Sequence, residues 1–230
     1  MTSSSPFQYI EATELDSTNE EARRLLQSDA LDQLTLIRAD RQTAGRGSQG
    51  RSWISPQGAG LYFSLVLPFA TLDNMQPHTV PLTPVFTLAA GVACAETIKA
   101  LTGLRIHLKP INDLYVHNRK LGGILVESLM SGNQCKALIT GIGINVFRHA
   151  EVDTGCEQEG RGNQPTSLQD CIPGQIFNQW HGDVMKKELC HAIAENVHGL
   201  YQNLIAGQEA LILERYEYFR QPDGKAFSLF

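Results

Sequence analysis

The sequence is poor in residues that would indicate a disulfide-stabilised or metal-stabilised protein. It holds five cysteines in 230 residues, and no two of them form a Cys-x-x-Cys pair. This odd number and wide spacing argue against a disulfide framework and a zinc site, so we expect reduced thiols in a cytoplasmic protein. The cysteines are Cys94, Cys135, Cys156, Cys171 and Cys190.

A basic excess, a signal peptide and a long apolar run are lacking as well. Nineteen Lys and Arg residues stand against 24 Asp and Glu residues, for a net charge of −5, whereas nucleic-acid-binding domains usually carry a positive excess. The amino terminus has no basic n-region and no apolar h-region, and no run is expected to approach the ~18 residues that span a bilayer. We therefore expect a cytoplasmic protein that binds neither nucleic acid nor membrane.

What is present is the pattern of an ordinary globular domain. Hydrophobic residues make up 42% of the chain, and runs of β-formers alternate with apolar residues at helical spacing. This mixture predicts an α/β (α+β) fold, a mixed β-sheet packed by helices. The expected strands are at residues 35–39, 61–67, 106–108, 113–116, 122–127 and 137–146. Three helices are expected: one that begins at residue 18, one at 87–102 and one at about 185–220.

Further predictions concern a helix cap, a loop and the bounds of the domain. Thr18 is expected to cap the first helix while Glu21 reaches back to it, as in a capping box. Residues 148–163 are polar and glycine-containing and predict a loop. The domain is expected to cover residues 1–220, and residues 221–230 are expected to begin a small second β domain.

A glycine loop at residues 45–51 has the spacing Gly45-x-Gly47-x-x-Gly50. That spacing matches a dinucleotide fingerprint, but the fingerprint must open a helix, and here Trp53 and a strand follow. The glycines still allow main-chain N–H groups to approach an anion, and Arg46 and Arg51 carry forked donors suited to carboxylate or phosphate. An anion-binding loop and a flexible surface loop with solvated arginines both remain open at this point.

Polar residues also gather in one predicted strand–turn–strand segment, at Lys109, Asn112, Asp113 and Lys120. Two lysines suit a site in which a carboxylate must attack an already anionic phosphate. Asn112 or Asp113 could hold Mg²⁺ or orient an incoming amine. The alternative is an exposed hairpin with solvated charges.

Taken together and in order, these motifs resemble the catalytic domain of the biotin protein ligases. The likeness extends from residue 17 to residue 168, over most of the domain. It rests on Asp16-Ser17-Thr18-Asn19, Gln42-Thr43-Ala44-Gly45-Arg46-Gly47, Gly50-Arg51-Ser52-Trp53, Ser55-Pro56, Lys109 with Asn112-Asp113, Lys120-Leu121-Gly122-Gly123-Ile124-Leu125-Val126-Glu127, Gly141-Ile142-Gly143-Ile144-Asn145-Val146 and Thr166-Ser167-Leu168.

The resemblance implies an enzyme that activates biotin with ATP and Mg²⁺ to biotinyl-5′-adenylate and passes the biotin to a lysine of a carboxylase biotin carboxyl-carrier domain. The catalytic residues it implies are Arg46, Lys109, Asp113 and Lys120. The biotin-binding residues would be Ser17, Thr18, Asn19, Gln42, Gly45, Arg46, Gly47, Lys120, Gly123 and Leu125. The nucleotide-binding residues would be Arg46, Gly47, Ser48, Arg51, Trp53, Asn112, Lys120 and Asn145.

The chain departs from the family pattern in three places. Ser48 stands where the family usually has arginine, and Pro110-Ile111 replaces Trp-Pro after Lys109. The family's small C-terminal β-barrel would be cut off after Phe230, and no N-terminal DNA-binding module is expected. Two rival functions stay open, a lipoate or octanoate transferase and a non-catalytic binder of biotin or its adenylate; homodimerisation also stays open.

Overall fold

The computed structural model describes residues 6–69, 83–132, 134–152, 164–179 and 182–220. Its centre is a seven-stranded sheet in the order β1-β2-β3-β7-β6-β5-β4, in which β1 and β2 are parallel and all other neighbours are antiparallel. The expected mixed sheet packed by helices is confirmed. The strands are β1 (Gln8–Leu15), β2 (Thr35–Gln42), β3 (Gly60–Pro68), β4 (His107–Lys109), β5 (Asp113–Val116), β6 (Arg119–Ser131) and β7 (Gln134–Asn145).

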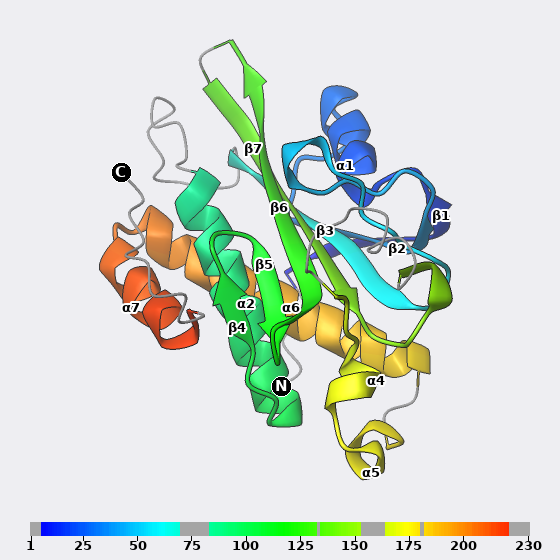
Figure 1. Ribbon diagram of the computed structural model, residues 1–230. Coiled ribbons are helices and arrows are strands. Elements are labelled where there is room, and N and C mark those ends of the chain that lie inside the picture. Colours follow the sequence, from blue (N-terminus) through cyan, green and yellow to red (C-terminus); the bar gives the residue numbers. More distant parts are fainter. Residues whose placement is uncertain (1–5, 70–82, 133, 153–163, 180–181, 221–230) are drawn as a thin grey trace, which may run out of the picture.

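Helices cover both faces of the sheet (Figure 1). On one face α2 (Thr83–Thr102) packs against α6 (Gly182–Ile205) and α7 (Glu209–Phe219), while α1 (Thr18–Gln27) packs on β3 and β7 from the other face. Neighbouring residues of β2 illustrate the division, because Leu36 belongs to the core cluster under α2 and Ile37 to the smaller cluster under α1. Successive side chains of a strand point to opposite faces, so one strand serves both clusters.

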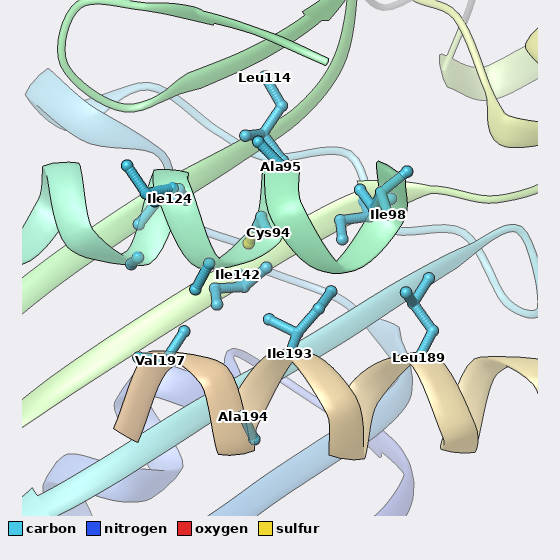
Figure 2. Packing of buried hydrophobic residues seen from close by; sticks show 14 of the residues in the cluster. Cys94, Ala95, Ile98, Leu114, Ile124, Ile142, Leu189, Ile193, Ala194 and Val197 are labelled. Atoms are coloured by element: carbon cyan, nitrogen blue, oxygen red, sulfur yellow. The ribbon is translucent and has the colours of Figure 1, made fainter. Parts of the chain in front are cut away.

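The core helix α2 is apolar on nearly all sides. By length and composition its segment Pro84–Thr102 could cross a bilayer, so the expectation that no segment reaches that length is wrong. In the protein 72% of this segment is buried, as expected for a core helix that is apolar all round. Figure 2 shows Cys94 and Ile98 of α2 facing Ile142 of β7, with Ile193 of α6 beyond it. Burial raises the pKa of the Cys94 thiol, which marks it as a packing residue.

The central strand β3 is buried along its whole length. It pairs with β2 on one side and β7 on the other, and both of its faces are covered. Such strands are usually continuous apolar runs. Ser64 interrupts the run with a hydroxyl group that is fully buried.

Several predicted elements differ from the observed ones. The N-cap of α1 is Ser17 and no side chain caps the helix, so the predicted capping box at Thr18 is wrong. The hydroxyl of Thr18 contacts Gln42 and Ser64 within the sheet wall instead. A capping box that was not predicted joins Ser167 and Asp170 at the start of α4.

The predicted carboxyl-terminal helix is two helices, α6 and α7, which are separated near Gly207 with its φ of 80°. The short helices α4 (Leu168–Cys171) and α5 (Gly174–Phe177) were not predicted. Residues 150–152 are helical where a loop was expected. The rest of that loop, at 153–163, and the expected β segment at 221–230 lie outside the described residues.

Candidate active site

A pocket lies on the α1 face of the sheet. Strand register places Asp113, Gly123 and Gly143 side by side on β5, β6 and β7, with Leu125 and Gly141 as the next pair along. The pocket holds about 1070 Å³ of empty space, including the part open to solvent. Its lining consists of Ser17, Thr18, Asn19, Gln42, Arg46, Gly47, Ser48, Arg51, Ser52, Trp53, Ile54, Asn112, Asp113, Lys120, Gly123, Ile124, Leu125, Gly141, Ile142, Gly143, Asn145, Val152 and Pro165.

The glycine loop folds back as a tight hairpin beside the pocket. The main-chain N–H of Gly47 donates to the carbonyl oxygen of Arg51 at 2.7 Å, and that of Trp53 donates to Gly45 at 2.8 Å. Gly50 has a φ of 73°, a left-handed conformation that glycine adopts without steric cost. The loop leads into β3, as predicted, so it lacks the helix that a dinucleotide fingerprint needs.

The indole of Trp53 lies against two glycines of the sheet. A Cβ atom at Gly143 would lie 2.5 Å from Trp53 Nε1, and one at Gly123 would lie 3.2 Å from the ring. Any other residue at Gly143 would therefore displace the indole. Trp53 Nε1 is buried and has no hydrogen-bond partner among the described residues. Because an unsatisfied buried donor costs free energy, this N–H suits an acceptor atom of a ligand.

Polar side chains gather where the start of α1 meets the end of β2. The Oε1 atom of Gln42 accepts the main-chain N–H of Thr18 at 2.8 Å, and its Nε2 donates to Ser55 Oγ at 2.8 Å. Asn19 Nδ2 donates to Glu127 Oε2 at 2.8 Å. Thr18 and Asn19 are both buried. This end of the pocket, which we call the polar end (residues 17–19 and 42), is thus held in a fixed arrangement of donors and acceptors.

Arg46 extends from the glycine loop toward two acidic residues. Its guanidinium forms ion pairs with Glu20 of α1 and, at 3.2 Å, with Oε1 of Glu127 at β6. Arg23 pairs with the same oxygen of Glu127 at 2.9 Å. Arg46 has five N–H donors, and these pairs fix the guanidinium at the pocket wall.

Ser48 connects the glycine loop with the β4–β5 turn. Its Oγ accepts from Asn112 Nδ2 at 3.0 Å and from a terminal nitrogen of Arg51 at 3.1 Å. The Nε of Arg51 also donates to the carbonyl oxygen of Ser48 at 3.2 Å. The serine that departs from the family pattern therefore ties two pocket-lining segments together.

Lys120 and Asp113 form an ion pair inside the pocket. Lys120 Nζ lies 2.8 Å from Asp113 Oδ1, with exposed side-chain fractions of 20% and 11%, and 5.4 Å from the centroid of the Trp53 ring. The main chain of Lys120 is held as well, since its N–H donates to Gln164 and its carbonyl accepts from Thr166. The amine is thus placed near the indole with little freedom.

Lys109 does not line the pocket, although the sequence suggested that it would join the other cations there. Register pairs it with Asp113, so both lie on one face of the sheet. Lys109 is exposed, however, and its Nζ lies 5.2 Å from the centroid of the Tyr115 ring. Lys109 lies on the edge strand β4, one strand farther from the pocket than Asp113 on β5.

The signature around Thr166 contributes to the site through its main chain. Asn145 Nδ2 donates to the carbonyl oxygen of Thr166 at 3.1 Å, and Pro165 bridges to Lys120. Asn145 and Pro165 both line the pocket. A segment more than 20 residues after β7 thereby completes its wall.

Sequence reasoning missed several contributors. Gly141 and Gly143 belong to a quoted motif. Their role, which is to leave room for the side chains of Asn19 and Trp53, depends on register across the sheet. Glu127 also belongs to a quoted motif and was assigned no role. Ser64 had a usable signal, because it is the one polar residue in the predicted strand at 61–67.

The arrangement suits a ligand with a polar head and an anionic tail. The polar end offers fixed hydrogen-bond partners, and the lining of the same pocket also includes Gly123, Leu125 and three cations, Arg46, Arg51 and Lys120. Cations held in a partly buried site stabilise developing negative charge more strongly than cations in water. Asp113 is the one carboxylate among the described lining residues.

Comparison with known proteins gives three consistent results. The family model described as "Biotin/lipoate A/B protein ligase family" matches residues 11–145. The bifunctional ligase/repressor BirA of Bacillus spizizenii is 37% identical over 139 residues, which is 60% of this chain and 40% of that protein. The biotin–[acetyl-CoA-carboxylase] ligase of Paracoccus denitrificans is 32% identical over 155 residues, 67% of this chain and 60% of that protein.

Among solved structures, the biotin protein ligase from Aquifex aeolicus in complex with biotin and ATP is similar to this chain. The TM-score is 0.67 at 27% sequence identity, and the match covers 93% of this chain and 78% of that one. The chain spans about two fifths of the length of the first relative named above. Because the matching family model covers more than half of the 230 residues, the chain belongs to the biotin/lipoate A/B protein ligase family.

Proposed function

We propose that this chain is the catalytic unit of a biotin protein ligase. It would activate biotin with ATP and transfer it to a lysine of a biotin carboxyl-carrier domain. The observation that carries the proposal is that Arg46, Arg51 and Lys120 line one pocket together with the fixed polar end. The Aquifex aeolicus relative binds biotin and ATP, and a pocket of this composition can take both.

Each part of the pocket has a place in this proposal. The biotin head group would bind at the polar end, against Ser17, Thr18, Asn19 and Gln42, with Gly123 and Leu125 lining its ring system and chain. The glycine loop, with Gly45 and Gly47, would cover the bound acid. The nucleotide would lie near Trp53, Asn112 of the β4–β5 turn and Asn145 at the end of β7, and its phosphates would meet Arg46, Arg51 and Lys120.

The first step joins two anions. A carboxylate oxygen of biotin attacks the α-phosphorus of ATP, a new P–O bond forms, and the bond to pyrophosphate breaks. Arg46 and Lys120 would hold the carboxylate and the α-phosphate together, so that repulsion between them is offset at the moment of attack. Lys109 lies outside the pocket, so its proposed share in this step has no geometric support.

The second step is acyl transfer. The neutral amine of an acceptor lysine attacks the acyl carbon of biotinyl-5′-adenylate, the amide bond forms, and AMP leaves with the electron pair of the broken C–O bond. Asp113, whose Oδ1 pairs with Lys120, would accept a proton from the incoming amine or orient it. In this scheme Lys120 would neutralise charge, and Asp113 would act as the base or orient the amine.

Mg²⁺ fits this pocket as an ion delivered with the nucleotide. No cluster of three or more His, Cys, Asp or Glu residues exists in the described parts of the chain, which argues against a cage made by the protein alone. Mg²⁺ is commonly held by one or two carboxylates together with substrate phosphates. Asp113 and Asn112 would hold it here, and the ion would supply further neutralisation of phosphate charge.

The test is the formation of the adenylate. Purified protein incubated with biotin and α-labelled ATP should yield labelled biotinyl-5′-adenylate and pyrophosphate, and adding a carrier domain should discharge it. Lipoate in place of biotin should give no product. Product with lipoate alone would favour the transferase alternative, and biotin binding without any product would favour the non-catalytic binder. The carrier-domain partner, the cytoplasmic location, the oligomeric state and the lack of nucleic-acid binding stay predictions.

A further inference from the structure

Ser64 lies beneath the polar end without lining the pocket. It is fully buried in β3 and pairs with Ile37 of β2 and Gly141 of β7. Neighbours on the same face, such as Ile37 and Val66, pack in the apolar cluster under α1. A hydroxyl group at this position has no use in apolar packing, because burying it without a partner costs free energy.

The hydroxyl of Ser64 instead contacts both side chains that form the pocket wall above it. Ser64 Oγ lies 2.6 Å from Asn19 Oδ1 and 2.7 Å from Thr18 Oγ1. Gly141, beside Ser64, leaves room for the amide of Asn19, since a Cβ atom at Gly141 would collide with Asn19 Oδ1. Two pocket residues are thus anchored on one buried oxygen.

The direction of each hydrogen bond follows from the outermost partner. Asn19 Nδ2 donates to the carboxylate of Glu127 at 2.8 Å, and an ionised carboxylate can only accept. Asn19 therefore presents Oδ1 to Ser64, and that atom also can only accept. In the 2.6 Å contact between them, Ser64 Oγ is consequently the donor and Asn19 Oδ1 the acceptor.

The polarity of Thr18 follows in turn. Ser64 Oγ also donates to Thr18 Oγ1 at 2.7 Å, so its single proton is shared between two acceptors. The proton of Thr18 is in turn donated to Gln42 Oε1 at 3.2 Å. Thr18 thus has no proton left for a ligand and presents lone pairs only.

We infer that Ser64 is a positioning residue that sets the polarity of the polar end. By donating to Thr18 Oγ1, it directs the proton of Thr18 to Gln42 and makes Thr18 an acceptor for an N–H donor of the ligand. The inference rests on the proposed function, because the cyclic urea of biotin supplies such N–H groups and the dithiolane of lipoate does not. Ser64 touches no ligand and acts through Thr18 and Asn19.

The test compares two buried hydroxyl groups. Ser64→Ala removes the one under the polar end. Thr140→Val removes a hydroxyl that is equally buried on β7 but faces the other side of the sheet, where it bonds Tyr201 at 2.9 Å. Ser64→Ala loses the contacts with Asn19 and Thr18, and Thr140→Val loses the one with Tyr201; a general loss of packing or stability should therefore appear in both variants. Ser64→Cys, with a weaker donor of similar size, is the second variant should Ser64→Ala fold poorly.

Biotin affinity by titration calorimetry and steady-state KM values for biotin and ATP are the readouts. Ser64→Ala should raise both the Kd and the KM for biotin roughly tenfold, the equivalent of one hydrogen bond, with KM for ATP and kcat within about twofold. Ser64→Cys should shift the same constants in the same direction by less, and Thr140→Val should leave them unchanged.

An unchanged biotin Kd in folded Ser64→Ala, or equal shifts in Ser64→Ala and Thr140→Val, would overturn the inference while leaving the ligase proposal intact. Failure of the unaltered chain to bind biotin would overturn the proposed function and this inference with it.

Discussion

Replacing Lys120 by alanine separates the two things that its amine does in the structure. The amine neutralises the carboxylate of Asp113 at 2.8 Å, and in the proposed mechanism it also holds the reacting anions. The first role affects the free energy of unfolding and the second affects the rate of adenylate formation. Both effects follow from the same contact, and the two can be measured apart.

The thermodynamic magnitude follows from the burial of the pair. Removing one partner of a fully buried ion pair costs about 3–5 kcal/mol, and exposed pairs contribute about 0–1 kcal/mol. With exposed side-chain fractions of 20% and 11%, Lys120→Ala should lower the free energy of unfolding by about 2 kcal/mol, between those limits. The double variant Lys120→Ala/Asp113→Ala leaves no unpaired charge and should be more stable than the single one.

The kinetic magnitude is larger. Removing one group that stabilises charge in a transition state typically lowers the rate by about 10²–10³. Single-turnover formation of labelled adenylate from saturating biotin and ATP measures it, and urea unfolding measures stability. The double variant should be no faster than Lys120→Ala, because it regains stability and not the cation.

Lys109→Ala is the matched control, since it removes a nearby lysine that lies outside the pocket over Tyr115. It should leave the adenylation rate within about twofold. A folded Lys120→Ala variant that forms adenylate within threefold of the unaltered rate would refute the role given to Lys120. A large loss in Lys109→Ala would restore Lys109 to the catalytic set.

Three further predictions follow from other contacts. Arg46→Ala should slow adenylate formation by at least about tenfold with a small change in biotin affinity; an unchanged single-turnover rate would remove Arg46 from the mechanism. Trp53→Phe deletes the buried N–H that has no partner within the described part of the chain and should weaken nucleotide binding about tenfold at unchanged stability, as titration calorimetry and thermal unfolding can show. The hydrogen bond from Arg24 lowers the pKa of Asp16 to about 2, so this pair stabilises the fold above pH 3.8 and the contribution is lost as the pH falls through about 2. Because both side chains are largely exposed, the difference in unfolding free energy between Asp16→Asn and the unaltered chain should be under about 1 kcal/mol at pH 5 and should shrink at pH 2.5; a constant difference would contradict the assigned cause.

The features that the sequence predicted well are local ones. The glycine loop is recognisable because the strand after Trp53 rules out a dinucleotide fingerprint, and β3 because its residues are nearly all apolar. The turn before Lys120 is also local, since His117 and Asn118 both adopt left-handed φ, 48° and 62°, which suits a two-residue hairpin. Residues of this kind owe their conformation to their immediate neighbours.

The features that the sequence predicted badly depend on contacts between distant segments. Thr18 fits a capping box by spacing, but its hydroxyl turns to Gln42, 24 residues on, and to Ser64, 46 residues on. Lys109 lies four positions before Asp113, yet Asp113 lines the pocket from β5 and Lys109 lies outside it on the edge strand β4. Such outcomes are decided by strand order and register, which a single sequence does not specify.

A structure of this chain with a non-hydrolysable biotinyl-adenylate analogue tests the central claim most directly. We expect the cyclic urea against Thr18 and Gln42, the acyl-phosphate group within hydrogen-bond distance of Arg46 and Lys120, and the adenine beside Trp53. A bound analogue whose acyl-phosphate group lies away from both Arg46 and Lys120 would contradict that claim.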